Sequence, residues 1–150
     1  MTARDHWERL SETGWRNMAV DYLAANREEP SVDEAQGELS KIDMIVTGMR
    51  FEAAFDKLWR FILLTLSLAE TDWQIELLGA GELEHLLGWQ QKWDGVDYIA
   101  LVEKEAQSNG KLNRALLITQ KYKMTDEVWT RVQRLKEQIK SQQLPLAGLH

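Results

Sequence analysis

The sequence predicts an all-α fold: a compact bundle or array of about seven helices in a single domain over residues 1–150. Only two of the 150 residues are prolines, Pro30 and Pro145, so the strongest helix breaker is missing from the long stretch between them. Apolar residues in that stretch recur at intervals of three and four, and no comparable segment alternates with the period of two that is typical of strands. A chain of this length buries about 68–70% of the surface that it exposes when unfolded, enough for a stable core.

Three helices are expected in the first part of the chain. The apolar face of the N-terminal helix is expected to consist of Trp7, Leu10, Gly14, Met18 and Tyr22. Ser31 and Glu34 have the spacing of a capping box, and the apolar residues that follow predict a second helix over residues 31–48. A third helix, over residues 51–68, is apolar nearly all round, as a helix at the centre of a bundle would be.

The next two helices are predicted around a glycine-rich turn. Thr71 and Gln74 form a second capping box, which opens a short helix from Asp72 to Leu78. That helix is expected to stop or bend at Gly79-Ala80-Gly81, a tight turn that lets two helices meet. A further helix, from Glu82 to Leu87, then begins on the turn.

Three more helices complete the prediction. Asp94 is expected to cap a helix that runs to about Ser108, where Asn109-Gly110 is a typical helix stop. The sixth helix covers residues 112–122, and Thr125 caps the seventh, in which apolar residues recur up to Ile139. Residues 143–150, around Pro145, are predicted to form a frayed tail.

Composition excludes several classes of site and compartment. The chain has no cysteine, so disulfides, a thiol nucleophile and cysteine-held zinc or iron–sulfur clusters are excluded, and a reducing, cytoplasmic location is expected. The N-terminal residues carry charges of both signs without the apolar run of a signal peptide. The longest apolar stretch, residues 58–69, falls far short of the roughly 20 residues of a membrane span. No membrane association is therefore expected.

Charge is distributed unevenly along the chain. The formal net charge is -6, yet residues 101–150 hold nine basic and five acidic residues, so the first hundred residues carry the acidic excess. Between residues 70 and 100 only Lys92 accompanies the acidic side chains, which are Glu70, Asp72, Glu76, Glu82, Glu84, Asp94 and Asp97. An acidic face is expected around the Gly-Ala-Gly turn, where it would attract a basic protein and repel nucleic acid. A solvated helix face that keeps the protein soluble is the alternative.

The seven tryptophans fall into different sequence contexts. Trp59 and Trp129 lie in apolar stripes and are expected in the core. Trp89 and Trp93 flank a polar connection, where an aromatic ring either fills a gap between helices or stands exposed as a binding anchor.

No set of catalytic residues is found, and the protein is not expected to be an enzyme. His85 lies three residues after Glu82, the E-x-x-H spacing of di-iron bundles, but the second copy that such a site requires is missing. No metal and no cofactor are therefore expected, and Gly79-Ala80-Gly81 lacks the context of a nucleotide-binding loop. The basic residues after 110 superficially suggest a helix-turn-helix. The chain as a whole is acidic, however, with a pI near 5.1, which argues against nucleic-acid binding.

Part of the chain resembles a known family. The carriers of the resemblance are Leu78-Gly79-Ala80-Gly81-Glu82-Leu83-Glu84-His85-Leu86-Leu87, Ile99–Ala106, Leu112–Leu116 and Trp129. They are similar to a family of small bacterial helical domains of unknown function with the signature G-A-G-P-L-E-x-L-L, although Glu82 replaces the usual proline. The resemblance implies an all-α domain and brings no active site; some members of such families look like antidotes encoded beside polymorphic toxins.

Two kinds of function therefore stay open. The first is an immunity protein that binds a cognate antibacterial toxin with a basic surface, through an acidic face with aromatic anchors. The residues expected to bind this partner are Glu82, Glu84, Trp89, Trp93, Asp94 and Asp97. The second is an enzyme or a small metal-binding bundle built on Glu82 and His85, with Glu52 or Asp56 as a further candidate. A blander alternative is a regulatory adaptor for another protein partner.

Overall fold

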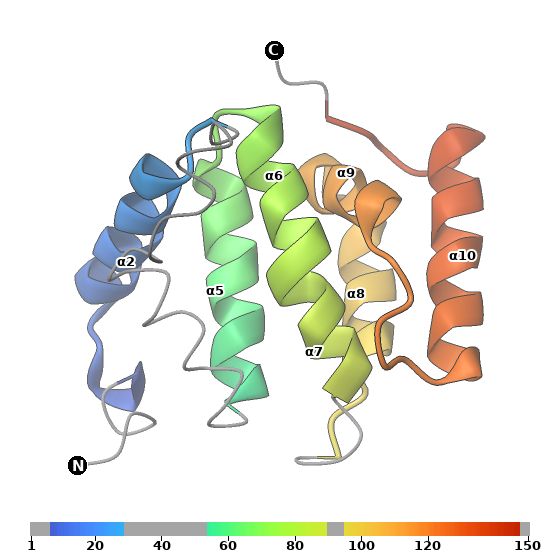
Figure 1. Cartoon of the computed structure of the whole chain (residues 1–150), viewed down its shortest axis with the longest axis horizontal. Coiled ribbons are helices and arrows are strands. Elements are labelled where there is room, and N and C mark those ends of the chain that lie inside the picture. Colours follow the sequence, from blue (N-terminus) through green and yellow to red (C-terminus); the bar gives the residue numbers. More distant parts are fainter. Residues whose placement is uncertain (1–6, 29–53, 90–94, 148–150) are drawn as a thin grey trace, which may run out of the picture. The chain divides into compact units, whose positions relative to one another are not determined.

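The computed structural model describes residues 7–28, 54–89 and 95–147 of the chain. Every regular element in these ranges is helical (Figure 1), so the all-α prediction is confirmed. The elements are α2 (Glu12–Ala25), α5 (Phe55–Leu68), α6 (Asp72–Leu78), the π-helical turn η1 (Gly79–Leu83), α7 (Glu84–Trp89), α8 (Tyr98–Ala106), α9 (Gly110–Ile118) and α10 (Asp126–Lys140). The helix expected over residues 31–48 lies outside the described residues.

The chain divides into two compact units, residues 1–74 and residues 75–150, with the boundary inside α6. The single domain stays a prediction. Across the described ranges, no helix combines the length and the apolar character that a membrane span needs.

The first unit is built on the packing of α2 against α5 (Figure 1). The side chain of Ser11 accepts a hydrogen bond from the backbone N–H of Gly14 at 3.0 Å, and this N-cap begins α2 at Glu12. The predicted continuous N-terminal helix is therefore wrong, because residues 7–9 form a separate helical turn. In the interface, the rings of Tyr22 and Phe61 meet edge to face with centroids 5.3 Å apart.

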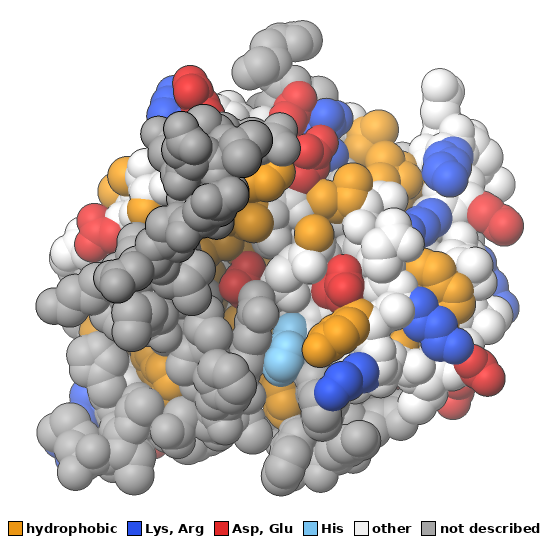
Figure 2. Space-filling view, viewed as in Figure 1, with side chains coloured by type: hydrophobic (Ala, Val, Ile, Leu, Met, Phe, Trp, Pro, Cys, Tyr) orange, Lys and Arg blue, Asp and Glu red, His pale blue; other side chains and the backbone are white. Residues whose placement is uncertain are grey.

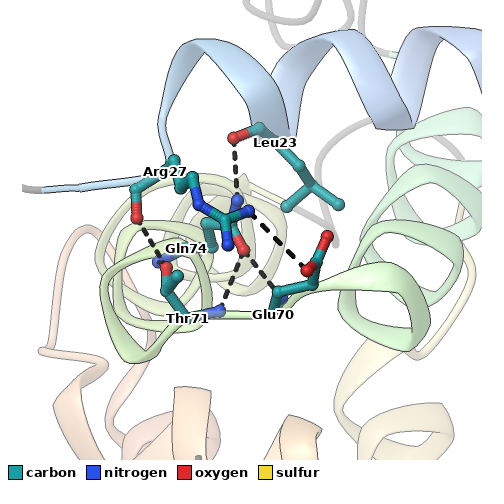
Figure 3. Close-up of polar contacts among 5 residues, drawn as sticks. All are labelled: Leu23, Arg27, Glu70, Thr71 and Gln74. Carbon is teal, nitrogen blue, oxygen red and sulfur yellow. Dashed lines mark hydrogen bonds and ion pairs between the residues drawn. The ribbon is translucent and has the colours of Figure 1, made fainter. Parts of the chain in front are cut away.

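The predicted capping box at Thr71 and Gln74 is confirmed (Figure 3). The hydroxyl of Thr71 accepts the N–H of Gln74 at 3.3 Å, and Gln74 Oε1 accepts the N–H groups of Thr71 at 3.0 Å and Glu70 at 2.7 Å. The same side chains also reach α2 and its C-terminal end: Gln74 Nε2 donates to the carbonyl of Leu23 at 2.7 Å, and the Thr71 hydroxyl donates to that of Arg27 at 2.6 Å. One local motif thus starts α6 and fixes the end of α2.

In the second unit, the expected turn at Gly79-Ala80-Gly81 is a π-helical turn that joins α6 to α7 without a break. Gly79 lies against α9 so closely that a Cβ atom there would be 2.2 Å from the carbonyl oxygen of Ala115. A π turn widens the helix and disturbs its regular hydrogen bonding. Here the hydroxyl of Thr119 donates to the Gly79 carbonyl at 2.9 Å. The expected stop or bend between α6 and α7 is therefore wrong, and the glycine instead allows η1 to pack closely against α9.

Helix boundaries in the rest of the unit follow the predicted motifs in part. Thr125 caps α10 as predicted, accepting the N–H of Val128 at 3.2 Å. Helix α8 ends at Ala106, shortly before the expected stop at Asn109-Gly110. The Asn109 side chain accepts the N–H of Leu112 at 3.0 Å and so also begins α9. Helix α8 starts at Tyr98, and Asp94, the expected cap, lies outside the described residues.

The chain after α10 is held in place as far as the described residues extend. Leu144 is buried, Asn113 Nδ2 donates to the carbonyl of Pro145 at 2.7 Å, and the N–H of Ala147 donates to the carbonyl of Gly110 at 3.2 Å. The frayed tail predicted over residues 143–150 is therefore wrong for residues 143–147. An apolar side chain and two hydrogen bonds offset the entropy lost in ordering this segment.

The tryptophans are placed differently from the prediction. Trp7 and Trp15 are buried, at 2% and 1% exposure, whereas Trp59 and Trp129 are half-buried. The expectation that Trp59 and Trp129 are core residues is thus too strong. Apolar periodicity identifies the face of the helix that turns inward, but whether a large ring at the edge of that face is fully covered depends on its neighbours.

Candidate interaction surface

The two glutamates expected on the acidic face have different environments. Glu82 lies in η1 and is 5% exposed, so it offers almost no surface to a partner. Glu84, the first residue of α7, is half-buried, and its carboxylate accepts the backbone N–H of Gln120 at 3.3 Å. The expectation of an exposed acidic face is therefore wrong at Glu82. Residues two positions apart on a helix, such as Glu82 and Glu84, point to different faces. Here the π turn directs Glu82 inward.

Asp97 is exposed and is held by an arginine. It precedes α8, and its carboxylate lies 3.6 Å from Nη1 of Arg131 on α10. Arg131 also forms a two-nitrogen hydrogen bond with Glu103 on α8, with the Nε contact at 3.2 Å, and an ion pair at 3.9 Å with Glu127. The bond to Glu103 raises the pKa of Arg131 above its usual value. One cation thus fixes the start of α8 against α10.

Two apolar side chains accompany Asp97 on this surface. Val96 is 40% exposed and Leu101 is 38% exposed. The N–H of Leu101 bonds to the carbonyl of Asp97, so the two residues lie one helical turn apart along the same side of the helix start. We call the surface formed by Val96, Asp97 and Leu101 the α8 face. It combines a positioned carboxylate with exposed apolar area, a mixture found at protein-binding surfaces.

The basic side chains of α10 are partly used inside the second unit. Lys136 donates a hydrogen bond to the carbonyl of Thr119, the residue that ends α9, and lies 5.1 Å from the centre of the Trp129 ring. Burial lowers its pKa, and the neighbouring Lys140 lowers it further. Acidic side chains lie among the Lys and Arg side chains on the surface over α10 (Figure 2). Arg131 in particular pairs with acidic side chains within the second unit.

Charge over the second unit is balanced, although its acidic residues come first in the chain. Residues 75–150 contain ten acidic and ten basic residues. The acidic excess of the chain therefore belongs to residues 1–74, which hold fourteen acidic and eight basic residues. The local acidity of the segment between Glu70 and Asp97 remains, but Arg131 reduces it at Asp97.

Three of the six residues expected to bind a partner cannot be placed as side chains. Trp89 ends α7, but its side chain lies outside the described residues, as do Trp93 and Asp94. Of the remaining three, Glu84 and Asp97 are accessible and Glu82 is not. Nothing in the described residues brings all six together.

Sequence reasoning missed Arg131 and the apolar members of the α8 face. Arg131 is one of nine basic residues in the last third of the chain, and nothing in its local sequence distinguishes it. The exposure of Leu101 could have been suspected, because Ile99 and Val102 already define a buried stripe that excludes it.

His85 is half-buried on α7, and the described ranges contain no group of three His, Asp, Glu or Cys side chains that could hold a metal ion.

The described residues define the class of an all-α protein. The chain belongs to DUF6869, a family of unknown function, which matches residues 28–139. This confirms membership of a family of unknown function, as the sequence resemblance implied. Comparisons with curated proteins and with solved structures find no match.

Proposed function

We propose that the protein acts by binding another protein, and that it is an immunity protein that neutralises a cognate antibacterial toxin in the cytoplasm. The observation that carries the proposal is the α8 face, where Asp97, an exposed carboxylate held by Arg131, is next in sequence to the exposed Val96 and one helical turn before the exposed Leu101. The resemblance of the segment from Leu78 to Leu87 to families that include antidote-like members supports the same function.

Electrostatics favours a basic partner for this face. Asp97 is the accessible carboxylate of this face, and the segment from Glu70 to Asp97 has more acidic than basic residues. Complementary charge accelerates encounter, while buried apolar contacts slow dissociation. Because the ion pair with Arg131 already restricts the Asp97 side chain, binding costs little further conformational entropy there, which favours affinity.

The proposed binding set differs from the one expected from the sequence. It keeps Glu84 and Asp97, retains Trp89, Trp93 and Asp94 from the sequence alone, adds Val96 and Leu101, and omits the buried Glu82. The tryptophans enter as sequence-based candidates for aromatic anchors.

The first test is cellular. A toxin encoded beside this protein is expressed in bacteria with and without it, and survival is counted. We expect the protein to restore growth. A neighbouring toxin that stays lethal in cells containing the folded protein would contradict the proposal.

The second test maps the surface with purified toxin. Leu101→Asp and Asp97→Arg should each weaken binding at least about tenfold, because one removes apolar area and the other repels a basic partner. Val20→Asp is the matched control, since Val20 is 46% exposed on α2 and lies outside the α8 face. Equal affinity of all three variants would show that the α8 face is not the interface.

The same preparations distinguish the alternative function. Stoichiometric iron, manganese or zinc in purified protein, lost on replacing His85, would favour a metal-binding bundle. Capture of a non-toxin protein that depends on Leu101 would favour a regulatory adaptor.

A further inference from the structure

The first unit contains a hollow between α2 and α5 that the sequence analysis did not anticipate. Its volume is about 430 Å³, within the roughly 300–1,000 Å³ of small-molecule sites. The residues that line it are Glu12, Thr13, Trp15, Arg16, Arg60 and Leu64. Both helices contribute, so the hollow depends on how α2 packs against α5.

Arg60 is held in place at this hollow by an aromatic ring. The carbon at the centre of its guanidinium group lies 4.7 Å from the centre of the Trp15 ring, which is itself 1% exposed and therefore firmly packed. Stacking on a ring restrains the planar guanidinium group but leaves the N–H donors at its edge available. Arg60 is thus prepared to donate hydrogen bonds without further ordering.

Arg16 brings a second guanidinium group to the hollow from the other helix. Both arginines are exposed, and within the described residues neither lies within ion-pair distance of a carboxylate. Among the described residues of the lining, Glu12, one helical turn before Arg16, is the one acidic side chain, so these residues together carry a net positive charge. An anion is the ligand that such a lining attracts.

We propose that this hollow binds a phosphate group. Each of the two guanidinium groups can donate hydrogen bonds to two oxygens of a phosphate, and the hydroxyl of Thr13 can donate to a further phosphate oxygen. A carboxylate has only two oxygens, too few for all of these donors. The hollow is larger than a phosphate ion, and Leu64 adds an apolar wall. A small phosphate ester, with an organic part against Leu64, therefore fits better than inorganic phosphate alone.

The test uses the full chain and two probes, inorganic phosphate and glycerol 3-phosphate, titrated separately by calorimetry at constant ionic strength. NMR follows the indole N–H of Trp15, assigned by its loss in Trp15→Phe. We expect binding of at least one probe that shifts this signal. Arg60→Gln and Arg16→Gln should each weaken it about tenfold or more, because each removes charge-assisted hydrogen bonds.

Three variants separate the site from bulk charge and from unfolding. Arg27→Gln removes the same charge at the other end of α2, where Arg27 pairs with Glu70 at 3.7 Å, and should leave affinity unchanged. Glu12→Gln should strengthen binding because it removes the one carboxylate among the described residues of the lining. Arg60→Lys keeps the charge but not the fork, and should retain only part of the affinity. Thermal melts establish that each variant is folded.

Each result decides the proposal without involving any toxin. Tighter binding of glycerol 3-phosphate identifies an ester site, and equal binding identifies a site for phosphate itself; both support the proposal. It is overturned if neither probe binds the folded protein at concentrations up to about 10 mM. It is equally overturned if Arg27→Gln weakens binding as much as Arg60→Gln does.

Discussion

Replacement of Gly79 by alanine tests the close packing that replaces the expected turn. A Cβ atom at this position would lie 2.2 Å from the carbonyl oxygen of Ala115, 2.9 Å from its carbonyl carbon and 3.0 Å from its Cα. All three obstructing atoms belong to the backbone of α9, so they cannot rotate aside as the end of a side chain can. η1 and α9 would have to separate to admit one methyl group.

The free energy of unfolding should fall by about 2 kcal/mol. Overpacking costs about 1–3 kcal/mol, and a backbone obstruction places this substitution at or beyond the upper end of that range. Replacing glycine by alanine within a helix returns about 1 kcal/mol. For a chain of this length the net loss corresponds to a fall of about 4–8 °C in the melting temperature.

Circular dichroism during thermal and urea unfolding measures the effect. Gly14→Ala is the matched control, because the nearest atom to its new Cβ is Cδ2 of Leu10 at 3.0 Å, the end of a flexible side chain. That variant should stay within about 0.5 kcal/mol of the parent or gain stability. The packing argument would be refuted if Gly79→Ala were as stable as Gly14→Ala.

Three further predictions concern polar groups inside the two units. Gln74→Ala should lower the free energy of unfolding by about 2–4 kcal/mol, because it leaves two N–H groups and the Leu23 carbonyl without their partner. Urea unfolding measures this loss, and a loss below about 0.5 kcal/mol would show that the capping box contributes little to stability. A double-mutant cycle with Arg131→Met and Glu103→Gln should give a coupling free energy of about 1 kcal/mol, the scale of a partly buried pair. Strictly additive effects of the two substitutions on stability would show that the pair contributes nothing. Burial lowers the pKa of Lys136 from 10.5, so just below pH 10.5 the folded state holds fewer protons than the unfolded state. The contribution of Lys136 to stability should therefore rise with pH in that window, and Lys136→Met should abolish the rise when urea unfolding is repeated at several pH values; an unchanged pH dependence would contradict the burial.

The candidate surface was predictable only in part. The acidic character of the segment from Glu70 to Asp97 is a property of the sequence, but the burial of Glu82 and the attachment of Asp97 to Arg131 are not. Positions along a helix indicate a direction, and the π turn changes that direction over five residues. The hollow with Arg16 and Arg60 was missed because the two arginines are far apart in sequence and meet only through the packing of α2 on α5.

The sequence by itself determined the features that depend on neighbouring residues. The all-α class follows from apolar periodicity and scarce proline, and the caps at Thr71 and Thr125 follow from hydrogen bonds over three residues. Only the tertiary structure decided why Gly79 is a glycine, which tryptophans are buried and that residues 143–147 are held against α9. These features depend on contacts between residues that are distant in the chain. No local pattern of residue types encodes that the Ala115 carbonyl oxygen would lie 2.2 Å from a Cβ atom at position 79.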